Sequence, residues 1–357
     1  MTVRGTTART ATTRVVTDIN RTAVLDALEE HGPLTRSALR ERTGLSPATV
    51  DRLCAALLDE GLIERAGAER SAGGGRPSTL FRFAGERRVI VTAAVSADGA
   101  RGMLVGVDGS AGVRAYGKDA FDLIGELLER CREAQRAVLG VAVSVPGVVD
   151  AQGRVSNSEE LGWQQFAVGS VVEHRFGLPC LVENDANAIA LGEWAQGAGT
   201  GATSLVAVVL GIGVGAGLVD GGRLIRGSRA AAGEIGHLLS GRESFGRLFA
   251  RTGDMESRIG GEVARVLDAG GPAADEALDY LALSLGALAS VFDPEVVVLS
   301  GVLPADTGGT VRALEQRLTG RIPFIPRIVT GRLGGDAALL GAGELMARRT
   351  KGSVYLA

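Results

Sequence analysis

The residues best placed to do chemistry come just after one short apolar segment, residues 179–182, which is followed closely by Asn184 and Asp185. In α/β proteins, ligands bind beyond the carboxyl ends of strands, and a carboxylate there can accept a proton from a hydroxyl group. An Asn-Asp pair after a strand is also common in plain turns. We take both residues as candidate ligand contacts, with Asp185 as the candidate proton acceptor.

Two further segments carry groups of a related kind. Glu234 and His237 lie three residues apart in the run Gly-Glu-Ile-Gly-His, and this spacing lets both side chains share one face of a turn or helix. Residues 210–217 have glycine at every second position, and backbone N–H groups in such a loop can cradle a phosphate. Glycines also serve tight hairpins, which is the alternative interpretation of this loop.

The elements around these segments alternate between strands and helices. Apolar runs at 138–145 and 296–299 predict buried strands, and residues 119–137 and 275–292 predict helices. This alternation is typical of an α/β protein. The chain has 357 residues, enough for two or three domains, and its 53 glycines suit the many turns of such a fold.

The N-terminal part has a different pattern. Helical spacing of apolar residues begins at Asp18, and His31-Gly32-Pro33 ends that helix. A short helix and a longer one follow, joined by a turn at Gly44, which is the layout of a helix-turn-helix that inserts its second helix into the major groove of DNA. The candidate DNA contacts here and in the adjoining wing are Thr35, Arg36, Ser46, Thr49, Arg52 and Arg76.

A wing follows the longer helix. Strands are expected at residues 62–65 and 80–83, with the glycine-rich turn 72–77 between them. Glycines and Pro77 hold Arg76 in that turn, which suits contact with phosphates or with the minor groove. The alternative is a small helical domain that only docks onto the body. We predict an α+β winged helix-turn-helix that binds DNA.

Composition narrows the classes of protein. The net charge is only −3, but the first 88 residues carry a small basic excess, as a DNA-binding front end would. The three cysteines are too few and too widely spaced for a disulfide framework or a Cys-rich metal site. Because no apolar run approaches the roughly 20 residues of a membrane span, we expect a cytoplasmic protein.

These motifs together resemble the ROK family, named for repressor, open reading frame and kinase. Residues 43–50 and 74–78 are similar to the N-terminal domain of ROK transcriptional repressors, and the body follows the family too. The resemblance implies a two-lobed, ribonuclease-H-like body of the actin and hexokinase type, with Asp185 at the catalytic-base position of the kinases. The sugar contacts that it implies are Gly147, Asn184, Asp185, Glu234 and His237.

The chain departs from ROK kinases where they bind phosphate. Those kinases have Asp-x-Gly-Gly-Thr after the first strand, and the matching residues 94–98 here read Ala-Val-Ser-Ala-Asp. Ala94 replaces the Asp expected to organise Mg²⁺, and Asp98 places a negative charge where ATP phosphates would lie. Ile212 replaces a Thr in the second phosphate loop, residues 210–217. We therefore predict that the protein is not an ATP-dependent enzyme.

The zinc loop of the family is also missing. Residues 238–256 contain no cysteine, and a zinc site of that kind needs thiolates to complete its tetrahedron. We expect no structural zinc and no other cofactor. The glutamate that follows this loop in the family binds sugar, and Glu243 and Glu256 are both candidates for it.

The expected domains are a disordered arm (1–15), the winged helix-turn-helix (16–84), a first body lobe (88–200 with 335–357) and a second lobe (201–334). We predict a sugar-responsive repressor of genes for carbohydrate uptake or metabolism, which binds double-stranded operator DNA as a homodimer or a tetramer. Two alternatives stay open. One is an ATP-dependent sugar kinase with a fused DNA-binding head, and the other is an architectural DNA-binding protein that binds no ligand.

Overall fold

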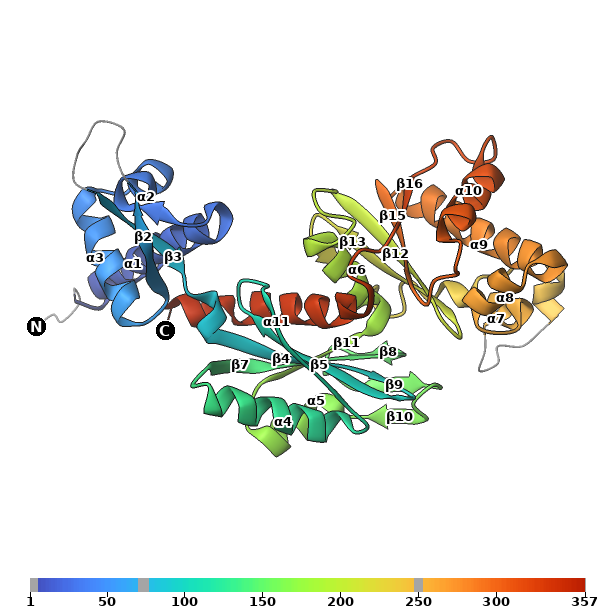
Figure 1. Ribbon diagram of the computed structural model, residues 1–357, viewed down its shortest axis with the longest axis horizontal. Helices are drawn as coiled ribbons and strands as arrows, with labels where there is room; N and C mark the ends of the chain where they lie inside the picture. Colours follow the sequence, from blue (N-terminus) through green and yellow to red (C-terminus); the bar gives the residue numbers. More distant parts are fainter. Residues whose placement is uncertain (1–5, 70–76, 247–252, 357) are drawn as a thin grey trace, which may run out of the picture.

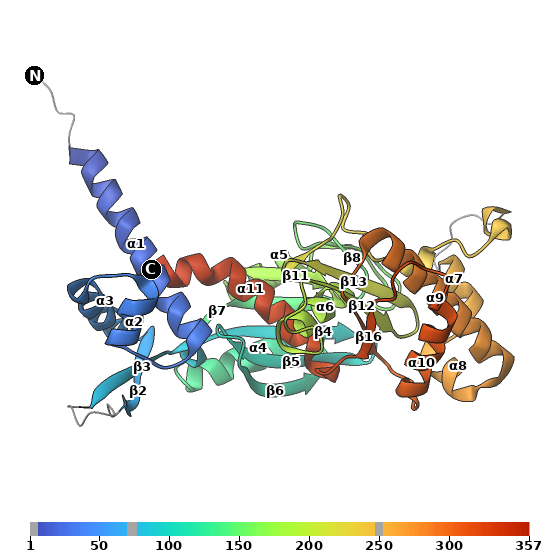
Figure 2. The same ribbon diagram turned by 90° about the horizontal axis from the view of Figure 1, so that it is seen from above.

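The computed structural model describes residues 6–69, 77–246 and 253–356. Figure 1 shows three groups of elements in a row: an N-terminal head, a first lobe built on one sheet, and a second lobe built on another. The last helix, α11 (Ala337–Leu356), lies over the sheet of the first lobe and ends beside the head. Figure 2 shows the same order from above, with α1 of the head extending away from the body.

The head is a winged helix-turn-helix, as predicted. Thr35 accepts a hydrogen bond from the N–H of Ala38 at 3.2 Å and begins the second helix, and Ser46 accepts one from Thr49 at 3.3 Å and begins the third. Gly44 ends the second helix with φ of 69°, a conformation that favours glycine. The elements are α1 (Thr6–His31), β1 (Leu34–Thr35), α2 (Arg36–Thr43), α3 (Pro47–Asp59), β2 (Ile63–Glu69) and β3 (Ser78–Phe83), with sheet order β1-β3-β2.

The first helix starts earlier than the sequence pattern indicates. We expected a disordered arm over residues 1–15, but α1 already begins at Thr6, so the expectation is corrected from that residue on. The physical reason is that neither Gly nor Pro occurs between Thr6 and His31, so nothing in that stretch ends a helix. Residues 1–5 lie outside the described residues.

The first lobe is a five-stranded sheet with helices on both faces. The strand order is β11-β7-β4-β5-β6, with β4, β7 and β11 parallel and β5 antiparallel to its neighbours. In Figure 1, α4 and α5 cover one face and α11 covers the other. The elements are β4 (Arg88–Ser96), β5 (Gly99–Gly106), β6 (Ala111–Gly117), α4 (Ala120–Glu133), β7 (Ala137–Val145), α5 (Val168–Phe176), β11 (Cys180–Asn184) and α6 (Asp185–Gln196). A small sheet, β8 (Val148–Val149), β9 (Val155–Ser158) and β10 (Trp163–Phe166), adjoins it.

The second lobe repeats the strand order of the first. Its sheet runs β14-β13-β12-β15-β16, so in both lobes the chain builds the third, second, first, fourth and fifth strands in that spatial order. This repeat confirms the predicted two-lobed, ribonuclease-H-like body. The elements are β12 (Ser204–Leu210), β13 (Val214–Asp220), β14 (Arg223–Leu224), α7 (Asp254–Ile259), α8 (Val263–Ala269), α9 (Gly271–Phe292), β15 (Val296–Gly301), α10 (Thr307–Leu318) and β16 (Arg327–Thr330).

The helices α6 and α11 pack against each other without side chains between their backbones. A Cβ on Gly341 would lie 1.8 Å from the carbonyl oxygen of Ala188, and one on Gly192 would lie 2.3 Å from that of Ala337. Only glycine permits such a close approach. Because α6 also packs on β12 and β13 of the second lobe, this helix pair joins the two lobes.

Candidate ligand site

One large cavity lies between the lobes, and three of the five predicted sugar contacts line it. Its volume is about 1460 Å³, and Gly147, Glu234 and His237 all line it. Asn184 reaches the same place, because its Nδ2 donates to the carbonyl oxygen of Gly147 at 3.0 Å. Asp185 follows directly. The structure therefore brings together five residues that come from both lobes and are up to 90 positions apart in the chain.

Asn184 and Asp185 sit where β11 ends and α6 begins. Asn184 is the N-cap of α6, because its Oδ1 accepts a hydrogen bond from the N–H of Asn187 at 3.0 Å. Asp185 Oδ1 accepts one from Ala186 at 2.8 Å and a second from Asn184 Nδ2 at 3.1 Å. Both side chains are thus oriented by backbone groups before any ligand arrives.

Burial is the main cause that raises the pKa of Asp185 to about 6; the charges of Glu160 and Glu234 add smaller contributions, and the hydrogen bond from the Ala186 N–H acts in the opposite direction. A carboxyl group whose pKa lies near the working pH can both accept and hold a proton. This is the property that a general base for a sugar hydroxyl requires, and it equally suits a carboxylate that recognises such a hydroxyl.

Glu234 and His237 occupy a short 3₁₀ turn (Ile235–His237) and the residue before it. Burial raises the pKa of Glu234, the charge of His237 lowers it, and the charge of Glu256 raises it. The three side chains therefore interact electrostatically, and all of them line the cavity.

Only one of the two glutamates that the sequence left open lines the cavity. Glu256 lines the cavity, and its carboxylate accepts hydrogen bonds from the N–H of Val214 at 3.0 Å and of Gly253 at 3.2 Å. Glu243 instead forms an ion pair with Arg258 at 3.2 Å. Glu256 is therefore the residue that stands beside Glu234 and His237.

The glycine-rich loop turns out to be the tight hairpin between β12 and β13. Gly211 donates to the carbonyl oxygen of Gly213 at 2.9 Å, and the N–H of Val214 is bound by Glu256. Ile212 lies at the tip and is 75% exposed. Two of the loop's N–H groups that could receive a phosphate are thus already bonded within the protein.

The segment matching the first phosphate loop is also a tight hairpin. Ser96 pairs with Gly99 across the two-residue turn Ala97-Asp98. The N–H of Ala97 donates to Glu160 Oε1 at 3.0 Å, and Glu160 lines the cavity. Sequence reasoning missed Glu160, for which the only signal was an acidic pair at residues 159–160 before a tryptophan.

The side chains that line the cavity are rich in negative charge. Glu159, Glu160, Glu234 and Glu256 line it, with Asp185 adjoining, and His237 is the basic residue among its lining side chains. Carboxylates at this density repel phosphate groups and favour neutral, hydroxyl-rich ligands.

The head places the predicted DNA contacts unevenly. Arg52 is exposed on α3 and Thr49 is half-buried near its start. Ser46 shares a 2.9 Å hydrogen bond with the Thr49 hydroxyl. Arg36 forms a 3.1 Å ion pair with Asp51, and its guanidinium carbon lies 4.8 Å from the ring centre of Phe81. These four residues share the end of the head formed by the start of α2 and α3.

The other two predicted DNA contacts, Thr35 and Arg76, are not among these four exposed or half-buried residues. Thr35 is only 7% exposed, and its hydroxyl caps α2, so it supports the helix-turn-helix from inside; its prediction as a DNA contact is corrected. A buried cap stabilises a helix but presents no group to DNA. Arg76, in the predicted wing turn, lies outside the described residues.

The three cysteines offer no reactive thiol at the surface. Cys54, Cys131 and Cys180 are buried free thiols, and burial raises the pKa of Cys180 to about 12. Among the residues that the structure describes, no group of three or more His, Cys, Asp or Glu side chains is arranged to hold a metal ion. Nor does any helix in the described ranges combine the length and apolar character needed to cross a bilayer.

Known proteins resemble both parts of the chain. Residues 16–77 match a model of the MarR family, and residues 115–250 match a model of the ROK family. The xylose repressor of Caldicellulosiruptor bescii is 30% identical over 232 residues, which are 61% of this chain and 58% of that protein. The chain thus spans less than two thirds of the length of the repressor it resembles.

Two further likenesses extend over the body and the whole chain. A glucokinase of Streptomyces coelicolor is 30% identical over 270 residues, covering 63% of this chain and 84% of the kinase. A crystal structure of a ROK family transcriptional regulator, described as a homolog of the E. coli MLC protein, superposes with a TM-score of 0.74 at 20% identity, over 96% of this chain and 98% of that one. At this identity the structure shows the fold alone, but the glucokinase and the family model place the sequence: this chain belongs to the ROK family.

Proposed function

We propose that this protein is a transcriptional repressor that binds operator DNA through its head and senses a sugar in the cavity between its lobes. The observation that carries the proposal is the hydrogen bond from the Ala97 N–H to Glu160. We call the two hairpins that match the family's phosphate loops, residues 94–99 and 210–214, the phosphate end, and we call Asn184, Asp185, Glu234 and His237 the sugar end. The hydrogen bond to Glu160 occupies a backbone N–H of the phosphate end, while at the sugar end Asn184 bonds to Gly147 and the side chains of Glu234 and His237 line the cavity.

The sugar end supplies what carbohydrate recognition needs. Carboxylates accept hydrogen bonds from hydroxyl groups, and an amide or imidazole can both donate and accept. Asn184 and Asp185 come from the first lobe and Glu234 and His237 from the second, so a sugar that contacts both pairs would draw the lobes together. Such a contact makes the ligand's affinity depend on lobe geometry, which is the requirement for an effector.

The phosphate end argues against an ATP-dependent kinase. Transfer of a phosphoryl group depends on cations and N–H donors around the phosphates. Here Glu160 and Asp98 bring negative charge to that end, and Ala94 offers no ligand for Mg²⁺. The head in turn supplies an exposed Arg52 on the helix that would enter the major groove, with Arg36, Ser46, Thr49 and Arg76 as further proposed contacts.

A gel-shift titration tests the proposal. The full chain is incubated at low salt with a duplex from its own upstream region, alone and with D-xylose, D-glucose or N-acetylmannosamine. We expect a salt-sensitive complex whose affinity changes with one of these sugars. Arg52→Ala should weaken the complex, while Arg132→Ala on the exposed end of α4 should not. No complex at any salt concentration would contradict the DNA-binding role.

One observation favours a second candidate, a sugar kinase with a DNA-binding head. Asp185 has a pKa of about 6 beside the cavity between the lobes, as a kinase base would, and the S. coelicolor relative is a glucokinase. ATP-dependent phosphorylation of a hexose, followed by a coupled assay and abolished by Asp185→Asn, would make this candidate the better one.

A further inference from the structure

The first strand of the body holds the end of the DNA-recognition helix. Arg88 is the first residue of β4, and its guanidinium donates to the carbonyl oxygen of Gly61 at 2.8 Å and to that of Glu60 at 3.0 Å. Glu60 is the C-cap residue of α3. The last carbonyls of a helix lack partners within the helix and carry partial negative charge, so a cationic fork is a favourable partner for them.

The same helix end is also joined to α1. The carboxylate of Glu60 accepts two hydrogen bonds from Arg21, a nearly buried residue of α1. Arg21 therefore binds the side chain of Glu60 while Arg88 binds its backbone. The orientation of α3 is thereby linked to α1 within the head and to β4 in the body.

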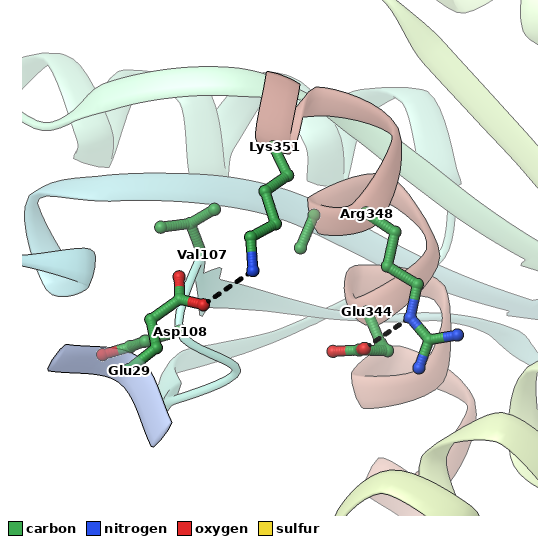
Figure 3. A pocket seen from close by; sticks show the side chains of 7 residues that line it. Glu29, Val107, Asp108, Glu344, Arg348 and Lys351 are labelled. Atoms are coloured by element: carbon green, nitrogen blue, oxygen red, sulfur yellow. Dashed lines mark hydrogen bonds and ion pairs between the residues drawn. The ribbon is translucent and has the colours of Figure 1, made fainter. Parts of the chain in front are cut away.

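A second contact between body and head lies on the other side of the junction. Lys351, near the end of α11, forms ion pairs with Asp26 at 2.8 Å and Glu29 at 3.0 Å, both on α1. Burial lowers the pKa of Lys351, but these two carboxylates outweigh that effect and the net shift is upward. Figure 3 shows Lys351 and Glu29 pointing toward each other across a small cavity of about 280 Å³.

Both contacts lie on elements that reach the ligand cavity. The strand β4 begins at Arg88 and ends at the hairpin where Ala97 binds Glu160. The helix α11 packs backbone to backbone on α6, whose N-cap is Asn184. Each contact thus fixes the head to an element whose other end, or whose packing partner, touches the proposed sugar site.

Apolar contact holds the head against the body, but it specifies the orientation of the head less sharply than hydrogen bonds and ion pairs do. The apolar core of the head continues into the body through Met346 and Ala347 of α11, and such contact is not directional. The hydrogen bonds from the Arg88 guanidinium to two carbonyl oxygens are directional, and so are the ion pairs of the Lys351 ammonium with two carboxylates.

We propose that Arg88 and Lys351 are positioning residues that hold the recognition helix α3 in one orientation relative to the ligand cavity. This inference rests on the proposed function, because a fixed orientation matters for a protein whose paired heads must fit an operator. Loss of both contacts leaves each head folded but variably oriented, so the cost of ordering the heads is added when DNA binds.

A distance measurement between spin labels tests this directly. Labels are placed on Glu41→Cys in the head and Glu133→Cys in the first lobe, both exposed positions, in the full chain. The three native cysteines are buried and leave the introduced thiols as the reactive ones. With the labelled protein mixed into an excess of unlabelled protein, so that distances within one chain dominate, double electron–electron resonance should give one narrow distance in the otherwise unchanged protein and lose that peak in the Arg88→Ala, Lys351→Ala variant.

The matched control removes an exposed arginine and an exposed lysine elsewhere, Arg132→Ala with Lys118→Ala, and should keep the narrow peak. The Arg88→Lys, Lys351→Ala variant keeps a positive charge at position 88 but lacks the two-pronged guanidinium, so it should recover the narrow peak in part. A circular-dichroism melt verifies that each variant is folded. A narrow peak that persists in the folded Arg88→Ala, Lys351→Ala variant would overturn the proposal.

DNA affinity separates this inference from the proposed function. If the unmodified protein shifts the duplex of its upstream region, the double variant should bind it about tenfold more weakly, as expected for loss of charge-assisted hydrogen bonds. If the unmodified protein shows the narrow peak and the variant loses it, but neither binds DNA, the positioning role is supported and the repressor function is contradicted.

Discussion

The sugar end and the phosphate end differ in which of their polar groups are bonded within the protein. At the sugar end, Asn184 and Asp185 keep the strand-to-helix geometry in which α/β proteins bind ligands, with Glu234 and His237 opposite. At the phosphate end, each of the two hairpins donates a backbone N–H to a glutamate that lines the cavity, Ala97 to Glu160 and Val214 to Glu256, and Glu256 also lies beside Glu234 and His237. The proposed sugar contacts therefore share the cavity with two hairpins whose N–H groups are bonded to carboxylates.

This difference matches what the proposed function requires of the fold. A kinase needs both ends because it must bring two substrates together, whereas a sensor needs only the end that recognises its effector. The sugar end can keep its geometry while carboxylates fill the other end. The proposed role of the protein depends on this asymmetry, which substitutions at the two ends can test separately.

The largest effect is expected at the sugar end, from Asn184→Ala. This change removes the cap of α6 and the link to Gly147. We expect roughly a hundredfold loss of affinity for whichever sugar binds the unmodified protein, since a buried polar contact is lost and the start of α6 loosens. Isothermal titration calorimetry measures it, with Asn157→Ala on the cavity wall as control. Equal losses in both variants would mean that Asn184 has no special place in the site.

The next effect is a pH dependence of stability that arises at Asp185. Because its pKa is raised from 3.8 to about 6, the folded protein binds this proton more tightly than the unfolded chain does. The ionised group therefore costs stability above pH 6, and the cost fades as the pH falls through 6 toward 4. Asp185→Asn keeps an acceptor for the Ala186 N–H and removes the charge. It should raise the free energy of unfolding at pH 7.5 by roughly 2 kcal/mol.

Thermal melts of both proteins from pH 4.5 to 7.5 check this. The difference in melting temperature between Asp185→Asn and the unmodified protein should shrink toward the acid end. The exposed Glu159→Gln serves as the control for a charge removed at the cavity mouth. A difference that is constant with pH would show that Asp185 is not the group whose ionisation is disfavoured.

Much of the structure could be predicted from the sequence, because the signals that specify these helices, turns and strands act over a few residues. The caps Thr35 and Ser46, the turn at Gly44 and the apolar strands each follow from rules that act within a few residues. The place of Asn184 and Asp185 at the end of a strand was likewise predictable, because both residues follow an apolar run. What the local pattern could not show was that the Thr35 hydroxyl faces the interior, since burial depends on how the helices pack.

The phosphate end was only half predictable. The departures at Ala94, Asp98 and Ile212 indicate that phosphate binding is impaired, but nothing near those residues names the group that takes its place. Glu160 lies 63 positions from Ala97 and meets it only because the two segments converge at the cavity. The choice of Glu256 over Glu243 has the same origin, because it depends on which side chain reaches the N–H of Val214.

A smaller effect is expected at the phosphate end, from Glu160→Ala. The change frees the N–H of Ala97 and removes one carboxylate from the cavity. Glucose 6-phosphate should then bind about threefold more tightly at low ionic strength, a modest gain because Glu160 is exposed and water already screens it. Calorimetry with Glu159→Ala as control distinguishes the bonded carboxylate from its neighbour. Equal gains in the two variants would show that only the summed charge of the cavity matters.

The smallest effect is expected from restoring the family's hydroxyl in the second loop, by Ile212→Thr. Ile212 is at the exposed tip of the β12–β13 hairpin, so the substitution should change stability by no more than about 0.5 kcal/mol. It should also give no thermal shift with ATP and Mg²⁺, because the neighbouring N–H groups stay bonded to Gly213 and Glu256. A nucleotide-dependent rise in melting temperature in this variant would mean that one hydroxyl, rather than the closed hairpins and their carboxylates, separates the two ends of the cavity.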